Sequence, residues 1–127
     1  MAALNQTGLA SAIQEWVSSG KPFLGVCLGL QVLFEKSEEG ELPGLALFPG
    51  YVQKFSLERK LKIPHMGWNT VRFAQPESAL IANLENEGEA FYFVHSYHVV
   101  PDDPDVIAAH FEYGLTGCAA IARGNLF

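Results

Sequence analysis

The sequence of 127 residues has few cysteines, few basic residues and no long hydrophobic run. Its two cysteines, Cys27 and Cys118, exclude a dense disulfide framework. With 8 Lys and Arg against 14 Asp and Glu, the formal net charge is −6, which argues against a surface for nucleic acid or anionic membrane. No apolar run approaches the length of a membrane span. Because 49% of the residues are hydrophobic, the chain is nevertheless apolar enough to form a folded core.

The most informative segment is Gly25-Val26-Cys27-Leu28-Gly29, in which a cysteine stands between two glycines. An apolar run over residues 23–26 leads into it, and a helix-like run over residues 28–34 follows. This pattern predicts a strand–turn–helix nucleophile elbow with Cys27 strained and exposed. The glycines are expected because a Cβ at either position would clash in so sharp a turn. A small buried cysteine is the alternative, but the flanks favour a catalytic one.

The elbow geometry has two predicted chemical consequences. It points the backbone N–H of Leu28 at the place where an oxyanion forms. It also places the sulfur of Cys27 at a helix N-terminus, which favours thiolate over thiol. A catalytic thiol must stay reduced, so we expect a cytoplasmic protein.

The remaining patterns predict an α/β chain with an antiparallel-rich second half. Apolar residues at helical spacing predict a helix around Leu9 and Val17, with Asn5 or Thr7 as its N-cap and Gly20 ending it. The elbow helix is expected to end near residues 37–40, and a short helix is expected over residues 78–84. Strands are expected at residues 51–55, 69–73, 90–95, 106–111 and 116–122.

Both ends of the sequence are unusual for a domain. Arg123-Gly124-Asn125-Leu126 predicts a two-residue hairpin turn, because Gly and Asn tolerate positive φ, yet the chain ends one residue later. At the front, a helix precedes the one parallel-type strand, residues 23–26, although a parallel sheet needs strands on both sides of its crossover helices. We therefore expect residues 1–127 to be a partial domain, an internal segment of a larger one.

Residues 25–31, Gly-Val-Cys-Leu-Gly-Leu-Gln, resemble the nucleophile motif of class I, triad-type glutamine amidotransferases. Within that class, two further segments resemble signatures of the glutaminase subunits of imidazole glycerol phosphate synthases. These segments are Pro64-His65-Met66-Gly67-Trp68-Asn69 and Tyr92-Phe93-Val94-His95-Ser96-Tyr97. The resemblance spans essentially the whole chain. It implies a flavodoxin-like α/β sandwich, truncated at both ends, with an antiparallel-rich C-terminal half.

The resemblance also implies a reaction, the hydrolysis of glutamine to glutamate and ammonia for histidine biosynthesis. Cys27 would be the nucleophile and the Leu28 amide an oxyanion donor, while Gly29, Gln31, Ser96 and Tyr97 would bind glutamine. Ammonia would pass to a (β/α)₈ cyclase subunit, and neither a metal nor another cofactor is implied. The residues that would face this partner are Pro64, His65, Met66, Gly67, Trp68, Asn69 and Tyr97.

The sequence lacks two segments of the family pattern. The family's catalytic histidine and glutamate lie in a Phe-His-Pro-Glu stretch just after a segment like residues 122–127, and its Pro-Gly-rich oxyanion loop precedes the elbow. Neither is in these residues, so we expect the chain itself to be inactive. His95 is interpreted as a scaffold residue, His98 and His110 as surface or strand-end residues, and Cys118 as core.

Two alternative functions remain, and two residue assignments have a structural alternative. The chain could belong to an amidotransferase of another pathway, such as anthranilate or carbamoyl phosphate synthesis, against which residues 64–69 argue. It could be a non-catalytic folding or interaction module. Taken alone, Gln31 could be a solvated helix residue and Trp68 a core residue.

The sequence also predicts an assembly. Apolar faces and strand edges that no other segment covers predict that the fragment forms a homo-oligomer.

Overall fold

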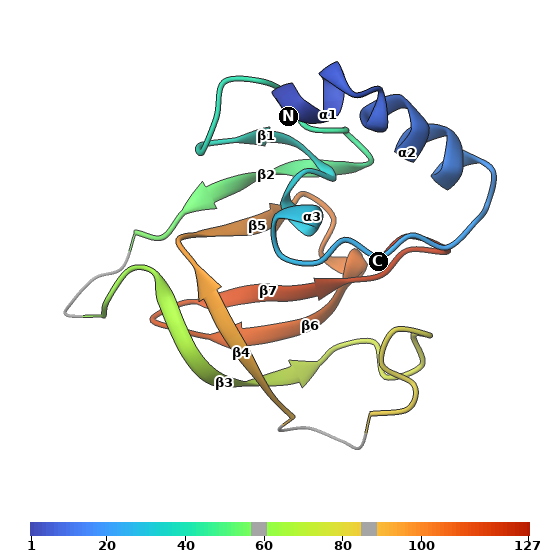
Figure 1. The fold of residues 1–127 in the computed structure, drawn as a ribbon. Helices are drawn as coiled ribbons and strands as arrows, with labels where there is room; N and C mark the ends of the chain where they lie inside the picture. The colour runs from blue at the N-terminus through green and yellow to red at the C-terminus, as the bar shows by residue number, and fades with distance from the viewer. Residues whose placement is uncertain (57–60, 85–88) are drawn as a thin grey trace.

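The computed structural model describes residues 1–56, 61–84 and 89–127. Helices lie mainly in the first quarter of the chain and strands in the rest, as Figure 1 shows. The helices are α1 (Ala2–Gln6), α2 (Leu9–Ser18), α3 (Leu28–Gln31) and the short 3₁₀ helix η1 (Pro104–Val106). The strands are β1 (Phe34–Ser37), β2 (Phe48–Lys54), β3 (His65–Phe73), β4 (Ala90–His95), β5 (Tyr97–Pro101), β6 (Ile107–Glu112) and β7 (Thr116–Ile121).

The strands form two sheets. One has the order β1-β2-β5, in which β1 and β2 are parallel and β2 and β5 antiparallel. The other has the order β4-β3-β6-β7, and all of its neighbours are antiparallel. The predicted α/β chain with an antiparallel-rich second half is therefore confirmed.

The first sheet begins where a helix is predicted, so the predicted extent of the elbow helix is wrong. Helix α3 ends at Gln31, and Phe34–Ser37 forms β1 instead. Phe34 is fully buried and its ring stacks on that of Phe48 with centroids 5.8 Å apart, in register across β1 and β2. Burying an aromatic ring in a sheet core stabilises the chain more than the modest helix propensity of this segment.

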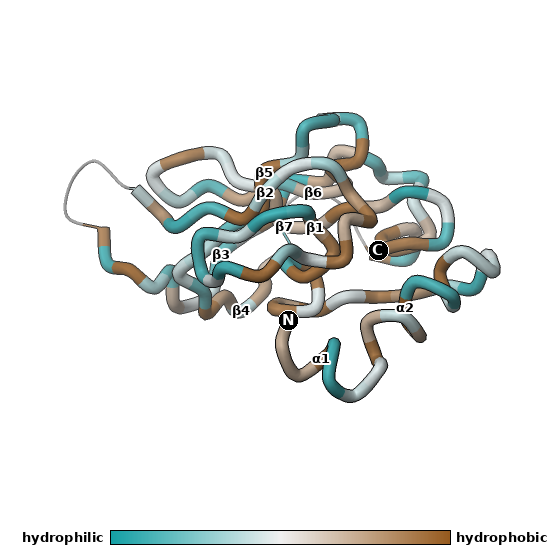
Figure 2. The backbone as a smooth tube through the Cα atoms, turned by 90° about the horizontal axis from the view of Figure 1, so that it is seen from above, coloured by the Kyte–Doolittle hydropathy of each residue, from teal (hydrophilic) through white to brown (hydrophobic). Residues whose placement is uncertain are grey.

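The N-terminal helices lie together on one side of the strands, as the view from above shows (Figure 2). The N-cap of α2 is Gly8, in the left-handed conformation with φ 75°, and Thr7 instead ends α1 by donating its hydroxyl to the carbonyl of Ala3. The predicted caps Asn5 and Thr7 are therefore wrong, whereas Gly20, with φ 78°, does follow the helix end. Ala10, Ile13 and Val17 pack against the core.

The end of the chain lies beside the segment that leads into the elbow (Figure 1). Arg123 and Leu126 exchange backbone hydrogen bonds across the predicted two-residue turn. Leu126 then forms a parallel bridge with Phe23, and Gly25 donates its N–H to the carbonyl of Phe127 at 2.8 Å. Residues 23–26 therefore make a parallel contact with the last residues of the chain, but only the single bridge at Phe23, so the strand predicted over residues 23–26 is not formed.

Two further elements differ from the predictions. Residues 78–84 form hydrogen-bonded turns rather than a helix. Strand β5 is not predicted by the sequence pattern, because it follows β4 after a single residue, Ser96, and reads as a continuation of the same apolar run. The bend at Ser96 moves the chain from one sheet to the other.

The core lies between the sheets and the α3 region. Its fully buried side chains include Phe34, Phe48, Phe111, Leu33, Ile121 and Val52. In the part of the chain that the structure describes, no helix is long and apolar enough to cross a membrane.

Candidate active site

The sharp turn at Cys27 is present. Cys27 is exposed and is the N-cap of α3, with φ 55° and ψ −111°. The amide of Gly29 donates to the carbonyl of Val26 at 2.9 Å, and the amide of Leu30 donates to that of Cys27 at 3.0 Å. A non-glycine residue held at positive φ costs about 1–3 kcal/mol and persists only where its surroundings impose it. The strained, exposed cysteine predicted from the sequence is therefore observed.

The two glycines of the elbow play different roles. A Cβ on Gly25 would lie 2.4 Å from the carbonyl oxygen of Gly29, so only glycine fits there. A Cβ on Gly29 would meet nothing within 4 Å. The predicted clash is confirmed at Gly25 and wrong at Gly29, because the Gly29 position faces open space while the strand side of the turn packs against the first turn of α3.

The amide of Leu28 is available to a ligand. The neighbouring amides of Gly29, Leu30 and Gln31 donate to carbonyls of the turn, whereas the Leu28 N–H donates to no group among the described residues. The first amides of a helix have no partner within it, and so they point outward. This leaves the Leu28 N–H, in the residue directly after Cys27, without a partner among the described residues.

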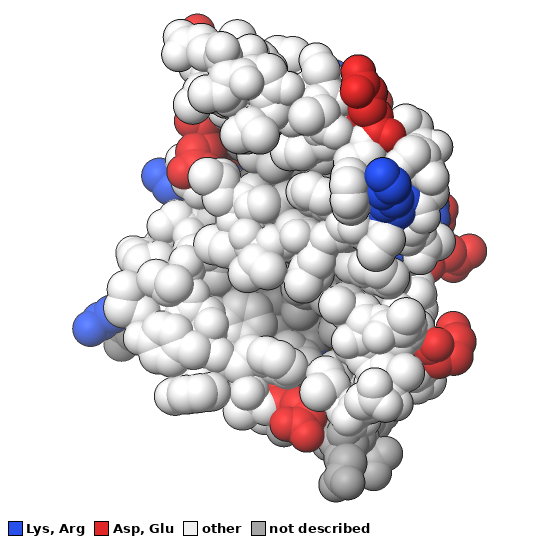
Figure 3. Space-filling model, turned by 45° about the vertical axis from the view of Figure 1, so that its right-hand side comes forward, with Lys and Arg blue, Asp and Glu red and all other residues white. Residues whose placement is uncertain are grey.

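A mainly apolar cavity of about 410 Å³ opens beside Cys27. It lies between the elbow and strands β4 and β7, and its wall includes Gln31, His95 and His98 as well as Cys27. The face shown in Figure 3 carries few charged side chains and is hollowed near its middle. Cys118 also lines the cavity, but it is 7% exposed, and burial raises the pKa of its thiol to about 12. Its predicted place in the core is confirmed.

Gln31 reaches the segment predicted to bind substrate. Its Nε2 donates to the carbonyl of Tyr97 at 3.4 Å, although 66 residues separate the two in sequence. The carbonyl of Ser96 accepts the amide of Phe55 at 3.0 Å. The structure therefore brings Cys27, Gln31 and Tyr97 to one side of the molecule, and the carbonyls of Ser96 and Tyr97 both bond within the chain.

His95 has both ring nitrogens occupied. Its Nδ1 lies 2.8 Å from the carbonyl of Tyr97, and its Nε2 lies 2.9 Å from Nδ1 of His65. Burial lowers the pKa of His95, and burial followed by the neighbouring His95 lowers the pKa of His65 to about 4. Both rings are therefore neutral at pH 7. Among the described residues, no group of three or more His, Cys, Asp or Glu side chains is placed to hold a metal ion.

The segment 64–69 divides between the two faces of β3. Met66 and Trp68 are 59% and 74% exposed, and the ring of Trp68 meets that of Tyr92 edge-on at 5.8 Å. His65 is only 3% exposed, and Asn69 donates to the carbonyl of Glu112 at 2.9 Å. Successive side chains of a strand point to opposite faces, so the His65 side chain lies on the inner face of β3, opposite Met66 and Trp68, and its interface role stays a prediction. Pro64, Gly67, Asn69 and Tyr97 are partly buried.

A family model described as glutamine amidotransferase class-I matches residues 4–125. The chain belongs to the class-I glutamine amidotransferase family. Nearly the whole chain lies inside this match, which includes the elbow and strands β3 and β4.

Relatives of this amidotransferase chain carry the name imidazole glycerol phosphate synthase subunit HisH, and three of them illustrate the match. The protein from Synechococcus sp. (strain JA-2-3B'a(2-13)) is 54% identical over 128 residues, covering 100% of this chain and 58% of the relative. That from Moorella thermoacetica is 51% identical, with coverages of 100% and 59%. That from Thermosynechococcus vestitus is 50% identical, with coverages of 100% and 61%. The chain thus spans about three fifths of the relatives' length.

The sequence reasoning missed the contacts that connect these parts of the amidotransferase. Phe55 is buried, and its ring lies 5.0 Å from that of His95 and 4.9 Å from that of His98. The hydrogen bond between His65 and His95 was also missed. A signal existed, because the alternation along β3 places residues 65, 69 and 71 on one face and 66 and 68 on the other. Nothing in the local pattern pairs β3 with β4.

Proposed function

We propose that this chain carries the nucleophile of a glutaminase that hydrolyses glutamine to glutamate and ammonia. The observation that carries the proposal is Cys27, exposed and held at φ 55° beside the free amide of Leu28. The proposal is supported by family membership and by relatives named as subunits of imidazole glycerol phosphate synthase. The proposed place of the reaction is therefore histidine biosynthesis, in the cytoplasm, where the thiol stays reduced.

The mechanism follows from the elbow. The thiolate of Cys27 attacks the side-chain amide carbon of glutamine, and the Leu28 N–H donates to the developing oxyanion. The C–N bond then breaks, and ammonia leaves with a proton supplied by a general acid. A glutamyl thioester remains, and water cleaves it to glutamate and the free thiol. By resemblance, Gly29, Gln31 and the Ser96–Tyr97 segment hold the glutamine during these steps.

The proton transfer needs a general base, and the resemblance assigns it to a histidine oriented by a glutamate in a Phe-His-Pro-Glu stretch. Two histidines of this chain line the same cavity as Cys27. His95 has no free ring nitrogen, and burial lowers the pKa of the His98 imidazole, which makes it a weaker base. We therefore expect the 127-residue chain alone to hydrolyse glutamine very slowly.

A glutamine analogue with an electrophilic group, 6-diazo-5-oxo-L-norleucine, tests the nucleophile without requiring turnover. We expect mass spectrometry of the treated chain to find one adduct, on Cys27, and excess glutamine to slow its formation. Cys27→Ala should take up no label, while Cys118→Ala should label like the unmodified chain. Labelling on Cys118, or labelling at Cys27 that glutamine does not slow, would contradict the proposal.

Turnover provides the second test. Loss of members of a catalytic triad costs on the order of 10⁴ to 10⁶ in rate, so glutamate release from the chain should lie near the blank. Turnover that disappears in Cys27→Ser would mean that a histidine already in the chain acts as base. In that case His98→Ala should abolish it and His110→Ala should not.

The proposed partner is the (β/α)₈ cyclase subunit that receives the ammonia. Exposed aromatic side chains are favoured interface anchors, and Trp68, at 74%, is the most exposed large hydrophobic residue in the described part of the chain. Binding to a cyclase from one of the relatives' organisms, measured by calorimetry, should weaken by about 30-fold in Trp68→Ala, as expected for a hot spot. Trp16→Ala is the matched control.

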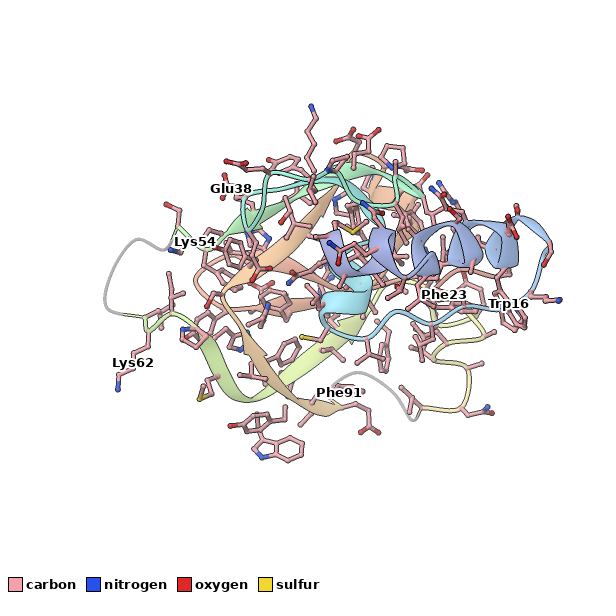
Figure 4. All side chains as sticks on the ribbon, turned by 45° about the horizontal axis from the view of Figure 1, so that its top comes forward. Trp16, Phe23, Glu38, Lys54, Lys62 and Phe91 are labelled. Atoms are coloured by element: carbon pink, nitrogen blue, oxygen red, sulfur yellow. The ribbon has the colours of Figure 1, made fainter. Side chains whose placement is uncertain are left out.

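Trp16 serves as control because it is also exposed, at 46%, but lies on α2. Figure 4 shows it near Phe23, far from the end of β4 that carries Phe91. Equal binding by Trp68→Ala and the unmodified chain would exclude this face as the cyclase interface.

A further inference from the structure

Four groups form one continuous hydrogen-bonded row beneath the outer face of β3. Nδ2 of Asn69 lies 3.2 Å from Nε2 of His65, and Nδ1 of His65 lies 2.9 Å from Nε2 of His95. Nδ1 of His95 lies 2.8 Å from the carbonyl of Tyr97. The row thus connects β3, β4 and the first residue of β5.

The two ends of the row determine the position of every proton in it. An amide nitrogen such as Nδ2 of Asn69 can only donate, so Nε2 of His65 accepts and its Nδ1 carries the hydrogen. His65 then donates to Nε2 of His95, which leaves the hydrogen of His95 on Nδ1. A backbone carbonyl can only accept, and so the carbonyl of Tyr97 ends the row. All the hydrogen bonds point one way, and only two neutral Nδ1–H rings satisfy them.

The rings in the row are tightly packed. His65 is 3% exposed and stacks between Tyr113, with centroids 4.0 Å apart, and Phe93, with centroids 4.7 Å apart. The buried ring of Phe55 meets His95 nearly edge-on at 5.0 Å. Neither imidazole can therefore rotate without disturbing an aromatic neighbour, and the proton order in the row is held by packing as well as by hydrogen bonds.

The carbonyl at the end of the row also bonds to the elbow helix. Gln31, the last residue of α3, donates Nε2 to the same Tyr97 oxygen at 3.4 Å. A carbonyl has two lone pairs, so it can accept from His95 and Gln31 together. Gln31 also donates its own backbone amide to the carbonyl of Cys27 at 3.3 Å. Gln31 therefore connects the Tyr97 carbonyl, at the end of the row, to the residue that carries the nucleophile.

We infer that His65 and His95 are positioning residues for the glutaminase site, a neutral relay that fixes the Tyr97 carbonyl and, through it, Gln31 and the turn of Cys27. The inference rests on the proposed function for its catalytic meaning, but the relay itself is a property of the folded chain. It gives His65 a role inside the molecule in addition to the partner contact that the sequence suggested.

The decisive measurement is the tautomer of each histidine, read from two-bond ¹H–¹⁵N spectra of the histidine-labelled chain at pH 7. We expect His65 and His95 both to be neutral with the hydrogen on Nδ1, the form that free histidine disfavours in water. An Nε2–H tautomer or a charged ring at either position would overturn the inference. This result does not depend on glutaminase activity, so it is separable from a failure of the proposed function.

The second measurement follows the relay to the elbow. In His65→Ala, which removes a ring that the row joins to Gln31 through His95 and the Tyr97 carbonyl, we expect the Gln31 side-chain amide and the backbone amides of α3 to shift. His110→Ala, on β6 and outside the row, should leave them unchanged. His95→Asn, whose amide can still donate to the Tyr97 carbonyl, should restore the Gln31 signals that His95→Ala loses. Unmoved Gln31 signals in both His65→Ala and His95→Ala would show that the row does not position the site.

Discussion

At the scale of single residues, the elbow depends on two glycines whose surroundings differ. A Cβ at position 25 would overlap backbone atoms of Gly29, which cannot move aside as a flexible side chain could. A Cβ at position 29 would face open space on a helix, where alanine is favoured over glycine by about 1 kcal/mol. The same substitution should therefore have opposite effects four residues apart.

We expect Gly25→Ala to lower the free energy of unfolding by about 1–3 kcal/mol, the usual cost of overpacking, and to disturb the Cys27 turn. Gly29→Ala should be neutral or stabilising by up to about 1 kcal/mol. Urea denaturation of the two variants and the unmodified chain measures both effects. Equal destabilisation by the two substitutions would mean that the turn is packed differently from this structure.

The two thiols form a second residue-scale contrast. Cys27 is exposed, whereas Cys118 is buried, hydrogen-bonded to the carbonyl of Ala120 at 3.5 Å and has its pKa raised to about 12 by burial. Iodoacetamide reacts with thiolates, so at pH 8 it should modify Cys27 at least about 10-fold faster than Cys118. Peptide mass spectrometry over time gives both rates. Equal or reversed labelling would show that the elbow is not formed in solution.

At the scale of elements, β3 and β4 are joined by polar as well as apolar contacts. His65 and His95 are paired in register across the two strands, and each has its pKa lowered by burial. Hydrogen-bonded neutral rings stabilise this pair only while they remain unprotonated. Strand pairing at the proposed site is therefore expected to depend on pH.

The sign of that dependence follows from linkage. The folded pKa of His65, about 4, lies below its ordinary value of 6.5, so between these pH values the unfolded chain binds more protons. The stabilising contribution is complete above pH 6.5 and is lost as the pH falls towards 4. Thermal unfolding followed by circular dichroism should show the melting temperature falling over this window.

The variant His65→Asn tests this pH dependence, because it removes the imidazole ring that titrates. His65→Asn should melt lower at pH 7 but lose less stability between pH 6.5 and 4 than the unmodified chain. His110→Asn, outside the relay, should retain the original slope. A slope unchanged in His65→Asn would assign the pH dependence to other groups.

At the scale of the whole molecule, two groups of exposed large apolar side chains lie around the elbow and on the β3–β4 face. Around the elbow these are Leu24, Val26 and Leu28, at 57%, 72% and 59% exposure. On the β3–β4 face they are Met66, Trp68, Tyr92 and Val94, at 59%, 74%, 57% and 53%. Contiguous exposed apolar surface favours association, while the net charge of −6 favours a soluble product over a precipitate.

We therefore expect the chain to form dimers or larger species at micromolar concentration, as measured by light scattering. Val94→Lys, on β4, should shift the population towards monomer. Leu9→Lys, at a similarly exposed position on α2 (51%), should not. A monomeric chain with a cooperative melt would show that these surfaces remain free in solution.

Much of the molecule was determined by local sequence patterns. Glycines flanking a cysteine specify a sharp turn, because sterics act over a few residues, and the turn was predicted correctly. Alternation predicted most of β2 and the second half of β3, because side chains of a strand point to opposite faces in turn, and runs rich in apolar residues predicted β4, β6 and β7. The family resemblance came from the same short segments, and the comparison confirmed it.

The remaining features were decided by contacts between distant segments. Residues 34–37 became a strand because Phe34 meets Phe48 in the core. Gly25 and Gly29 look alike in sequence, and only the packing of the turn against α3 separates them. His65 points inward to His95, 30 residues away, rather than outward with Trp68. Periodicity is a local property, whereas the identity of a buried partner depends on how sheets pair, so only the tertiary structure could place these residues.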